Sequence, residues 1–142
     1  MVNVNEHYAT MIKLISENLD KDSNALLKEL GVTSSQMYLL LMLANSAEQE
    51  YTLKQLEGKL RMSQPTVAGL SNRLESKDLI EGYISPDDKR VKRVRITAKG
   101  NEIYNLAVEK LERYESEKTK IFTSEEKKEF VRLLSKLYQS LG

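Results

Sequence analysis

Basic side chains gather in one stretch of this 142-residue chain. Between Lys89 and Lys99 stand six lysine or arginine residues and no carboxylate. The wider segment 54–99 holds eleven basic and six acidic residues and is +5, whereas the rest of the chain is −4. A basic segment between acidic flanks is typical of a surface that meets a polyanion.

Residue types that support most catalytic and metal chemistry are missing. The chain has no cysteine, which excludes disulfides, thiolate nucleophiles and cysteine zinc sites. It has one histidine, His7, so neither a Ser-His-Asp triad nor a multi-histidine metal site can be assembled. We therefore expect no catalytic residue, no metal, no cofactor and no enzymatic activity.

A second candidate group lies on one face of a predicted helix. Residues 52–77 read as a helix-turn-helix, with a short helix, the turn 61–63 and a second helix, 64–77. The apolar spacing buries Val67, Leu70 and Leu74 and leaves the polar side chains on the opposite face. Amide and guanidinium groups on such a face can pair with base edges in a DNA major groove. The alternative is an ordinary amphipathic helix with a solvated polar face.

The basic stretch itself is predicted to be a hairpin, residues 79–96, which we call the wing. Residues 79–85 and 91–96 read as strands, and Pro86-Asp-Asp-Lys89 has turn chemistry. Alternation places Arg93 and Arg95 together on the outer face. A basic tip on a thin hairpin can enter a minor groove, whereas the alternative role is to protect a sheet edge.

The elements that position these groups are mostly helical. Capping boxes begin at Thr33, Thr52 and Thr123, and Ser63 and Thr97 are further helix starts. Apolar periodicity predicts helices over 5–29, 34–46, 53–60, 64–77, 98–120 and 124–141. The fold class is therefore mainly α with a small β-hairpin, arranged as a winged helix-turn-helix.

The terminal helices carry apolar stripes that a small winged domain covers only in part. We expect one domain, 1–142, with a winged-helix region at 33–97 and helical dimerisation regions at 1–30 and 98–142. The alternative is a monomer whose long helices cover each other. The longest apolar run, residues 37–44, is too short to span a membrane, and no signal segment begins the chain, so a cytoplasmic protein is expected.

These motifs, taken together, resemble the MarR family (multiple antibiotic resistance repressors). The resemblance covers nearly the whole chain and rests on four segments: Ser63-Gln-Pro-Thr-Val67, Asn72-Arg-Leu-Glu-Ser-Lys-Asp-Leu-Ile80, Ser85-Pro-Asp-Asp-Lys-Arg90 and Val94-Arg-Ile-Thr-Ala-Lys-Gly100. It implies a dimeric winged-helix transcription regulator, with helix 64–77 in the major groove and the wing arginine in the minor groove. It also implies release by a small anionic aromatic effector.

The expected DNA contacts combine helical phase with the wing motif. Base reading falls to Gln64, Pro65, Asn72 and Arg73. Phosphate positioning falls to Ser63, Thr66 and Lys89, and Arg93 lies on the outward face of the wing. Arg90 enters the minor groove with Asp88 as its organiser. Candidate effector-lining residues are Tyr38 and Met42, although the favoured interpretation of both is that they are core residues.

Two glycines depart from the family pattern. Gly69 stands where many members carry a polar side chain, and Gly82 stands in a strand where a basic residue is frequent, which allows close backbone approach or a bulge. The expected function is a sequence-specific transcriptional repressor that binds a pseudo-palindromic operator as a homodimer. The alternative is a winged-helix protein-interaction module without specific DNA binding.

Overall fold

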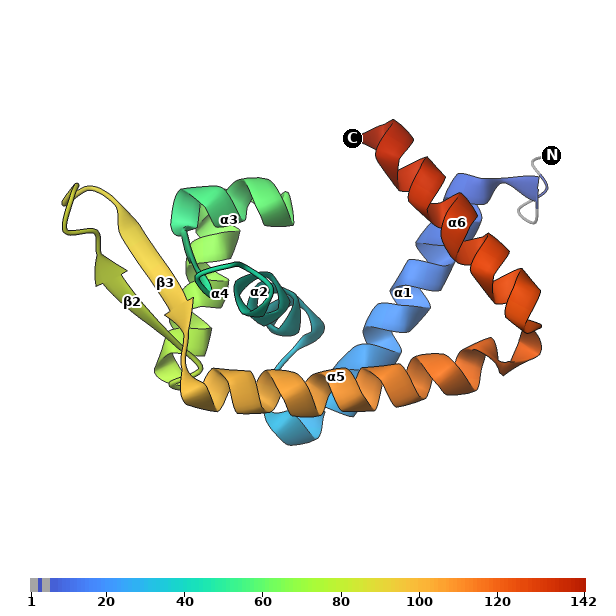
Figure 1. The fold of residues 1–142 in the computed structure, drawn as a ribbon, viewed down its shortest axis with the longest axis horizontal. Helices are drawn as coiled ribbons and strands as arrows, with labels where there is room; N and C mark the ends of the chain where they lie inside the picture. The colour runs from blue at the N-terminus through green and yellow to red at the C-terminus, as the bar shows by residue number, and fades with distance from the viewer. Residues whose placement is uncertain (1–2, 4–5) are drawn as a thin grey trace. The chain divides into compact units, whose positions relative to one another are not determined.

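The computed structural model describes residue 3 and residues 6–142, and most of them lie in helices. In chain order the elements are α1 (Tyr8–Leu27), the 3₁₀ turn η2 (Lys28–Leu30), α2 (Ser34–Ala44), β1 (Glu50–Thr52), α3 (Leu53–Leu60), α4 (Gln64–Ser76), β2 (Ile80–Ile84), β3 (Lys92–Ile96), α5 (Ala98–Lys118), the 3₁₀ turn η3 (Thr119–Ile121) and α6 (Ser124–Leu141) (Figure 1).

The helix starts follow the predicted caps. Thr33, Thr52 and Thr123 each form a complete capping box. The threonine hydroxyl accepts from the backbone N–H three residues later, and the side chain of that later residue accepts from the backbone N–H of the threonine. Ser63 caps α4, and Thr97 Oγ1 accepts from Gly100 N at the start of α5. The first predicted helix ends earlier than expected, since η2 and the left-handed Gly31 follow α1. Its expected start, residue 5, lies outside the described residues.

The chain forms two compact units, Met1–Glu109 and Lys110–Gly142. In the first unit, α2 is the central helix, because Leu39, Leu40 and Leu43 are all fully buried. The inward faces of α3, α4 and the sheet pack around it. This confirms that the apolar run in α2 marks a buried helix and not a membrane segment. Within the described part of the chain, no helix is both long and apolar enough to cross a membrane.

The sheet has three strands, one more than the sequence predicted. β1 pairs with β3, and β3 pairs with β2, all antiparallel. The prediction of a two-stranded hairpin was therefore incomplete. β1 has only three residues, and its partner lies more than forty residues further along the chain, so neither alternation nor turn chemistry could reveal it.

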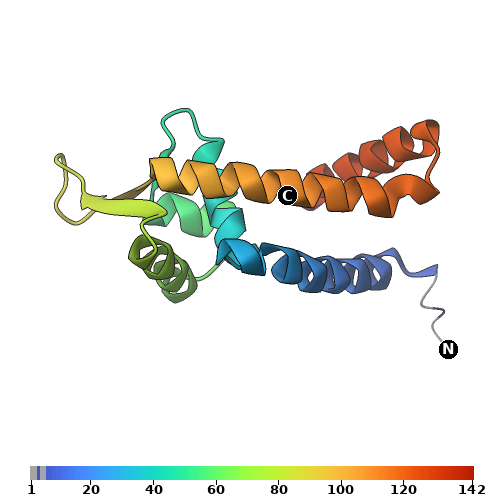
Figure 2. The ribbon, with the colours of Figure 1, turned by 90° about the horizontal axis from the view of Figure 1, so that it is seen from below.

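The far end of the wing projects away from the helices of the first unit. Both views show the loop between β2 and β3 beyond α3 and α4, with the base of the hairpin beside α4 (Figures 1 and 2). At that base, Ile80, Val94 and Ile96 are buried. The base of the wing is thus fixed by packing, whereas the loop at its far end projects into solvent.

The second unit contains the end of α5, η3 and α6. The rings of Phe122 and Phe130 lie 5.4 Å apart at the bend between the helices. No described residue of α6 is buried, although the helix has a clearly apolar face. That face includes Phe130, Val131, Leu133, Leu134, Tyr138 and Leu141, each at least 41% exposed.

Candidate nucleic-acid interface

Helix α4 has the two faces that its sequence predicts. Val67, Leu70 and Leu74 are buried against the domain. On the other side, the expected contact residues of the helix and its cap are all exposed: Ser63, Gln64, Pro65, Thr66, Asn72 and Arg73. All six side chains are therefore accessible to a partner in solution.

The first turn of α4 holds its own hydroxyl groups in place. Ser63 Oγ accepts from Thr66 N at 3.4 Å and lies 2.9 Å from Thr66 Oγ1. Pro65 in the first turn has no N–H to leave unpaired. The two hydroxyls bond to each other and still keep capacity for a phosphate oxygen.

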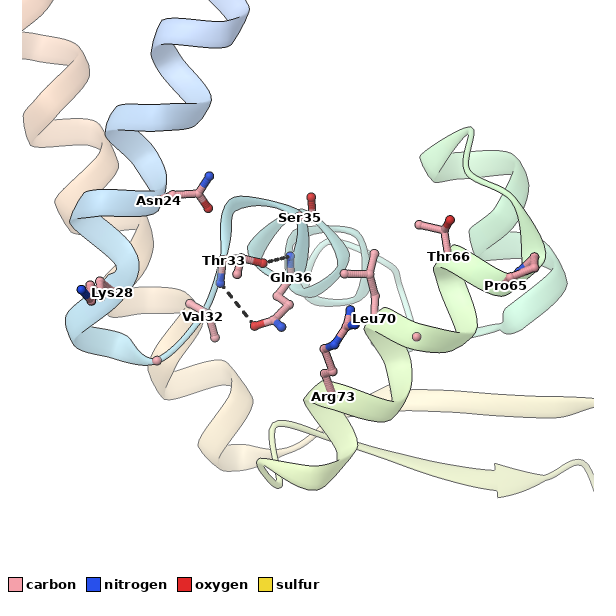
Figure 3. A pocket seen from close by; sticks show the side chains of 12 residues that line it. Asn24, Lys28, Val32, Thr33, Ser35, Gln36, Pro65, Thr66, Leu70 and Arg73 are labelled. Carbon is pink, nitrogen blue, oxygen red and sulfur yellow. Dashed lines mark hydrogen bonds between the residues drawn. The ribbon is translucent and has the colours of Figure 1, made fainter.

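An open groove of about 950 Å³ lies beside the exposed face of α4 (Figure 3). It is bounded by the end of α1, the start of α2 and residues of α4, including Pro65, Thr66 and Gly69. Its charged lining residues are Lys28 and Arg73, and none of its lining residues is acidic. The groove is therefore electropositive and continuous with the surface of α4.

Gly69 leaves space for the neighbouring arginine. A Cβ at this position would meet Arg73 Nη1 at 3.8 Å, an ordinary contact distance. The glycine is thus not required by packing within the chain. Because residue 69 has no side chain, the surface of α4 has a shallow depression between Thr66 and Arg73.

The tip of the wing is organised by one carboxylate. Asp88 Oδ1 accepts from the backbone N–H of Arg90 at 3.0 Å and from Arg90 Nε at 3.1 Å, and Asp88 Oδ2 accepts from Arg90 Nη2 at 3.2 Å. The Arg90 side chain is nevertheless 90% exposed. These bonds from Arg90 hold the pKa of Asp88 below its ordinary value. Arg90 is therefore oriented by the loop and presented to solvent, and Lys89 beside it is exposed too.

The basic residues on the outer face of β3 have acidic partners that the sequence analysis did not identify. Arg93 Nη1 lies 3.9 Å from Glu50 Oε1 on β1, and Arg95 pairs with Glu81 on β2. The hydroxyl of Tyr83 donates to Glu50 Oε2 at 2.6 Å, and this bond raises the pKa of Tyr83. The Arg93 side chain is two-thirds buried, and both arginines of this face have a carboxylate nearby.

The base of the wing is joined to α4 by Glu75. Its Oε1 accepts from Gly82 N at 3.0 Å, and its Oε2 lies 3.3 Å from Lys92 Nζ. A Cβ at Gly82 would lie 2.8 Å from Glu75 Oε1 and 2.6 Å from Lys92 Cε. The glycine thus allows this close approach, and a side chain here would require the flexible ends of Glu75 and Lys92 to shift. Of the two possibilities given by the sequence, the close approach is the one found.

The two residues proposed to line an effector site lie elsewhere. Tyr38 is 43% exposed and Met42 is half-buried, both on α2. Neither lines the groove beside α4. Among the described residues, no group of three histidine or acidic side chains could hold a metal ion.

Comparison with known proteins agrees with this geometry. The model of the MarR family matches residues 32–92, from the turn before α2 to the start of β3. This segment of the chain is therefore similar to the MarR family. It is 25% identical over 139 residues to the uncharacterized HTH-type transcriptional regulator YsmB of Bacillus subtilis, covering 96% of this chain and 94% of that protein.

Solved structures of MarR family proteins share the fold. A cysteine-to-serine variant of MarR from E. coli, in complex with operator DNA, has a TM-score of 0.82 and 25% identity, over 96% of this chain and 99% of that one. The MepR–DNA complex from S. aureus has a TM-score of 0.84 and 23% identity, over 94% and 98%. The chain thus has the winged-helix fold of these MarR family structures.

Proposed function

We propose that this chain is a MarR family transcriptional regulator, which binds double-stranded DNA in a sequence-specific manner, as a homodimer, and represses transcription. The observation that carries the proposal is the combination, in one unit, of an exposed polar face on α4 and a projecting wing with an oriented, exposed Arg90. A helix and a hairpin of this kind suit adjacent major and minor grooves.

Each side chain has a proposed role that follows from its chemistry. Gln64, Asn72 and Arg73 read base edges, and Pro65 offers apolar contact to a thymine methyl group. Ser63, Thr66 and Lys89 contact phosphates, and Arg90 enters the minor groove while Asp88 holds it. Arg93, which lies 3.9 Å from Glu50, is proposed as a further DNA contact on the outer face of the wing.

The dimer is proposed from the apolar faces of the terminal helices. In addition to α6, helix α1 exposes Tyr8, Met11, Ile12, Leu14, Ile15 and Leu19, each at 40% or more. A two-fold dimer that covers such faces presents two copies of α4, and this predicts an operator with inverted half-sites about 34–36 Å apart or a multiple of it.

A small-molecule effector remains part of the proposal, with Tyr38 and Met42 as its lining residues. A phenolic acid that binds the native chain would raise its midpoint of thermal unfolding. The proposal also places the protein in the cytoplasm and assigns it no enzymatic activity.

Selection from a pool of random duplexes tests the function. We expect repeated rounds to enrich an inverted repeat, and Arg90→Ala to weaken binding to the enriched duplex about tenfold. If no sequence is enriched and the chain binds a protein partner in a salt-insensitive way, the winged-helix interaction module is the better description.

A further inference from the structure

The residue that ends α4 forms a bridge to the junction between α1 and α2. Lys77 is the C-cap of α4, and its side chain is half-buried. Its Nζ donates to the carbonyl of Gly31 and, at 3.0 Å, to Gln36 Oε1. Both acceptors are neutral, so the positive charge of Lys77 is held by dipoles and not by a carboxylate.

The acceptors of this bridge are themselves fixed. Gly31 has a left-handed backbone, with φ 73°, that ends η2. Gln36 is 4% exposed, and its Oε1 also accepts from Thr33 N at 3.2 Å within the capping box of α2. The junction is tied to α1 as well, since Asn24 Oδ1 accepts from Ser34 N at 2.7 Å. Lys77 therefore attaches α4 to a rigid point.

The same turn is held from the opposite direction by the start of α5. Lys99 Nζ donates to the carbonyl of Lys77 at 3.1 Å, and Thr97 Oγ1 donates to that of Asp78 at 2.7 Å. A Cβ at Gly100 would lie 2.0 Å from the carbonyl oxygen of Leu79. The motif Thr97-Ala-Lys-Gly100 thus docks the start of α5 onto the end of α4.

These directional hydrogen bonds oppose sliding and rotation of α4, which its apolar contacts resist only weakly. Val67, Leu70 and Leu74 fix the depth of the helix, but dispersion contacts resist sliding and rotation only weakly. Base reading requires placement to within about 0.5 Å. Asn72 and Arg73 lie only five and four residues before Lys77, respectively, so the bridge controls their placement.

We propose that Lys77 is a positioning residue for DNA reading, which sets α4 against the α1–α2 junction through Gly31 and Gln36. The inference rests on the proposed function. The competing role for an uncompensated cation on this helix is a direct phosphate contact. Salt dependence separates the two roles, because each lost phosphate contact lowers the salt slope by about 1.

The test compares three variants on two duplexes: the one enriched from the random pool and a scrambled duplex of equal composition. We expect Lys77→Met to lower the ratio of the two affinities about tenfold, with the salt slope on the scrambled duplex unchanged. Lys77→Arg, which retains donors and charge, should recover the ratio to within about threefold. Lys21→Met removes one exposed charge from α1, outside the groove and without any bridge, and should leave the ratio unchanged.

Two results would overturn the proposal. A uniform loss on both duplexes with a lower salt slope makes Lys77 a phosphate contact. If Lys77→Met leaves the ratio of the two affinities unchanged, Lys77 has no role in sequence-specific DNA reading. If Lys77→Met fails to fold, Lys99→Met weakens the same turn from the exposed side, and we expect it to lower the ratio about threefold.

Hydrogen exchange in the free chain separates this proposal from the proposed function. In Lys77→Met, we expect amides 72–76 to exchange about tenfold faster, with α3 unaffected. If the unaltered chain binds all duplexes with equal affinity, the proposed function is wrong. If hydrogen exchange of amides 72–76 is unchanged in Lys77→Met, the bridge is refuted, whatever the DNA result.

Discussion

At the scale of single residues, sequence periodicity predicts which positions of α4 are exposed and which are buried. It does not predict the ion-pair partners of the basic residues. Helical phase predicted the exposure of Asn72 and Arg73 and the burial of Leu74. It could not identify the carboxylates of Glu50 and Glu81 that neutralise the outer face of β3, because they come from strands elsewhere in the chain. A count of the charges between residues 89 and 99 thus overstates the positive electrostatic potential on the outer face of the wing.

Two glycines in helices should respond oppositely to the same substitution. Gly69→Ala should raise the free energy of unfolding by about 1 kcal/mol, since a Cβ meets nothing closer than Arg73 Nη1 at 3.8 Å. Gly100→Ala should lower it by about 1–3 kcal/mol, since its Cβ would overlap the backbone of Leu79. Chemical denaturation measures both, and a loss of stability in Gly69→Ala would contradict the open face of α4.

The pKa of Asp88 reports the geometry of the wing tip. Because the pKa is below its ordinary value of 3.8 in the folded chain, the pair with Arg90 stabilises the loop above that pH, and the contribution is lost as the pH falls through the lower value. In Arg90→Ala the pKa of Asp88 should rise part of the way to 3.8, because the backbone N–H of residue 90 still donates.

Carboxyl NMR titration checks this prediction. Glu129, whose pKa is lowered by Arg132 on α6, serves as the control and should not move. An Asp88 pKa that is the same with and without the guanidinium would show that the side-chain pair does not exist in solution.

At the scale of elements, local signals predicted the helices well. Capping boxes and the spacing of apolar residues predicted the starts of α2, α3 and α6, because both signals act within one or two turns. The strand β1 and the bridges of Glu75 and Lys77 depend on contacts across the fold. Such contacts have no local signature, so the sequence could not predict them.

The carboxylate of Glu75 should couple the wing to α4. Glu75→Ala removes the bonds to Gly82 N and Lys92, and we expect faster hydrogen exchange in residues 80–84 and about tenfold weaker DNA binding. Glu75→Gln keeps an oxygen for Gly82 N and should lose only about two- to threefold, since the ion pair is partly exposed. Equal behaviour of both variants and the unaltered chain would show that the wing is held by its apolar base alone.

At the scale of the whole molecule, the exposed apolar face of α6 predicts self-association. Leu134→Asp places a charge on that face and should convert the chain to a monomer at micromolar concentration, as measured by sedimentation. Gln139→Asp, on the opposite face of the same helix, should remain a dimer. If the unaltered chain sediments as a monomer, the dimer and its paired half-sites are wrong.

The most direct test of specific DNA reading is fluorescence anisotropy with the enriched duplex and its scrambled counterpart over a series of salt concentrations. We predict tighter binding to the enriched duplex by at least about a thousandfold, saturation at two chains per duplex, and a steep loss of affinity with salt on both. Equal affinity for the two duplexes, or no binding to either at low salt, would contradict it.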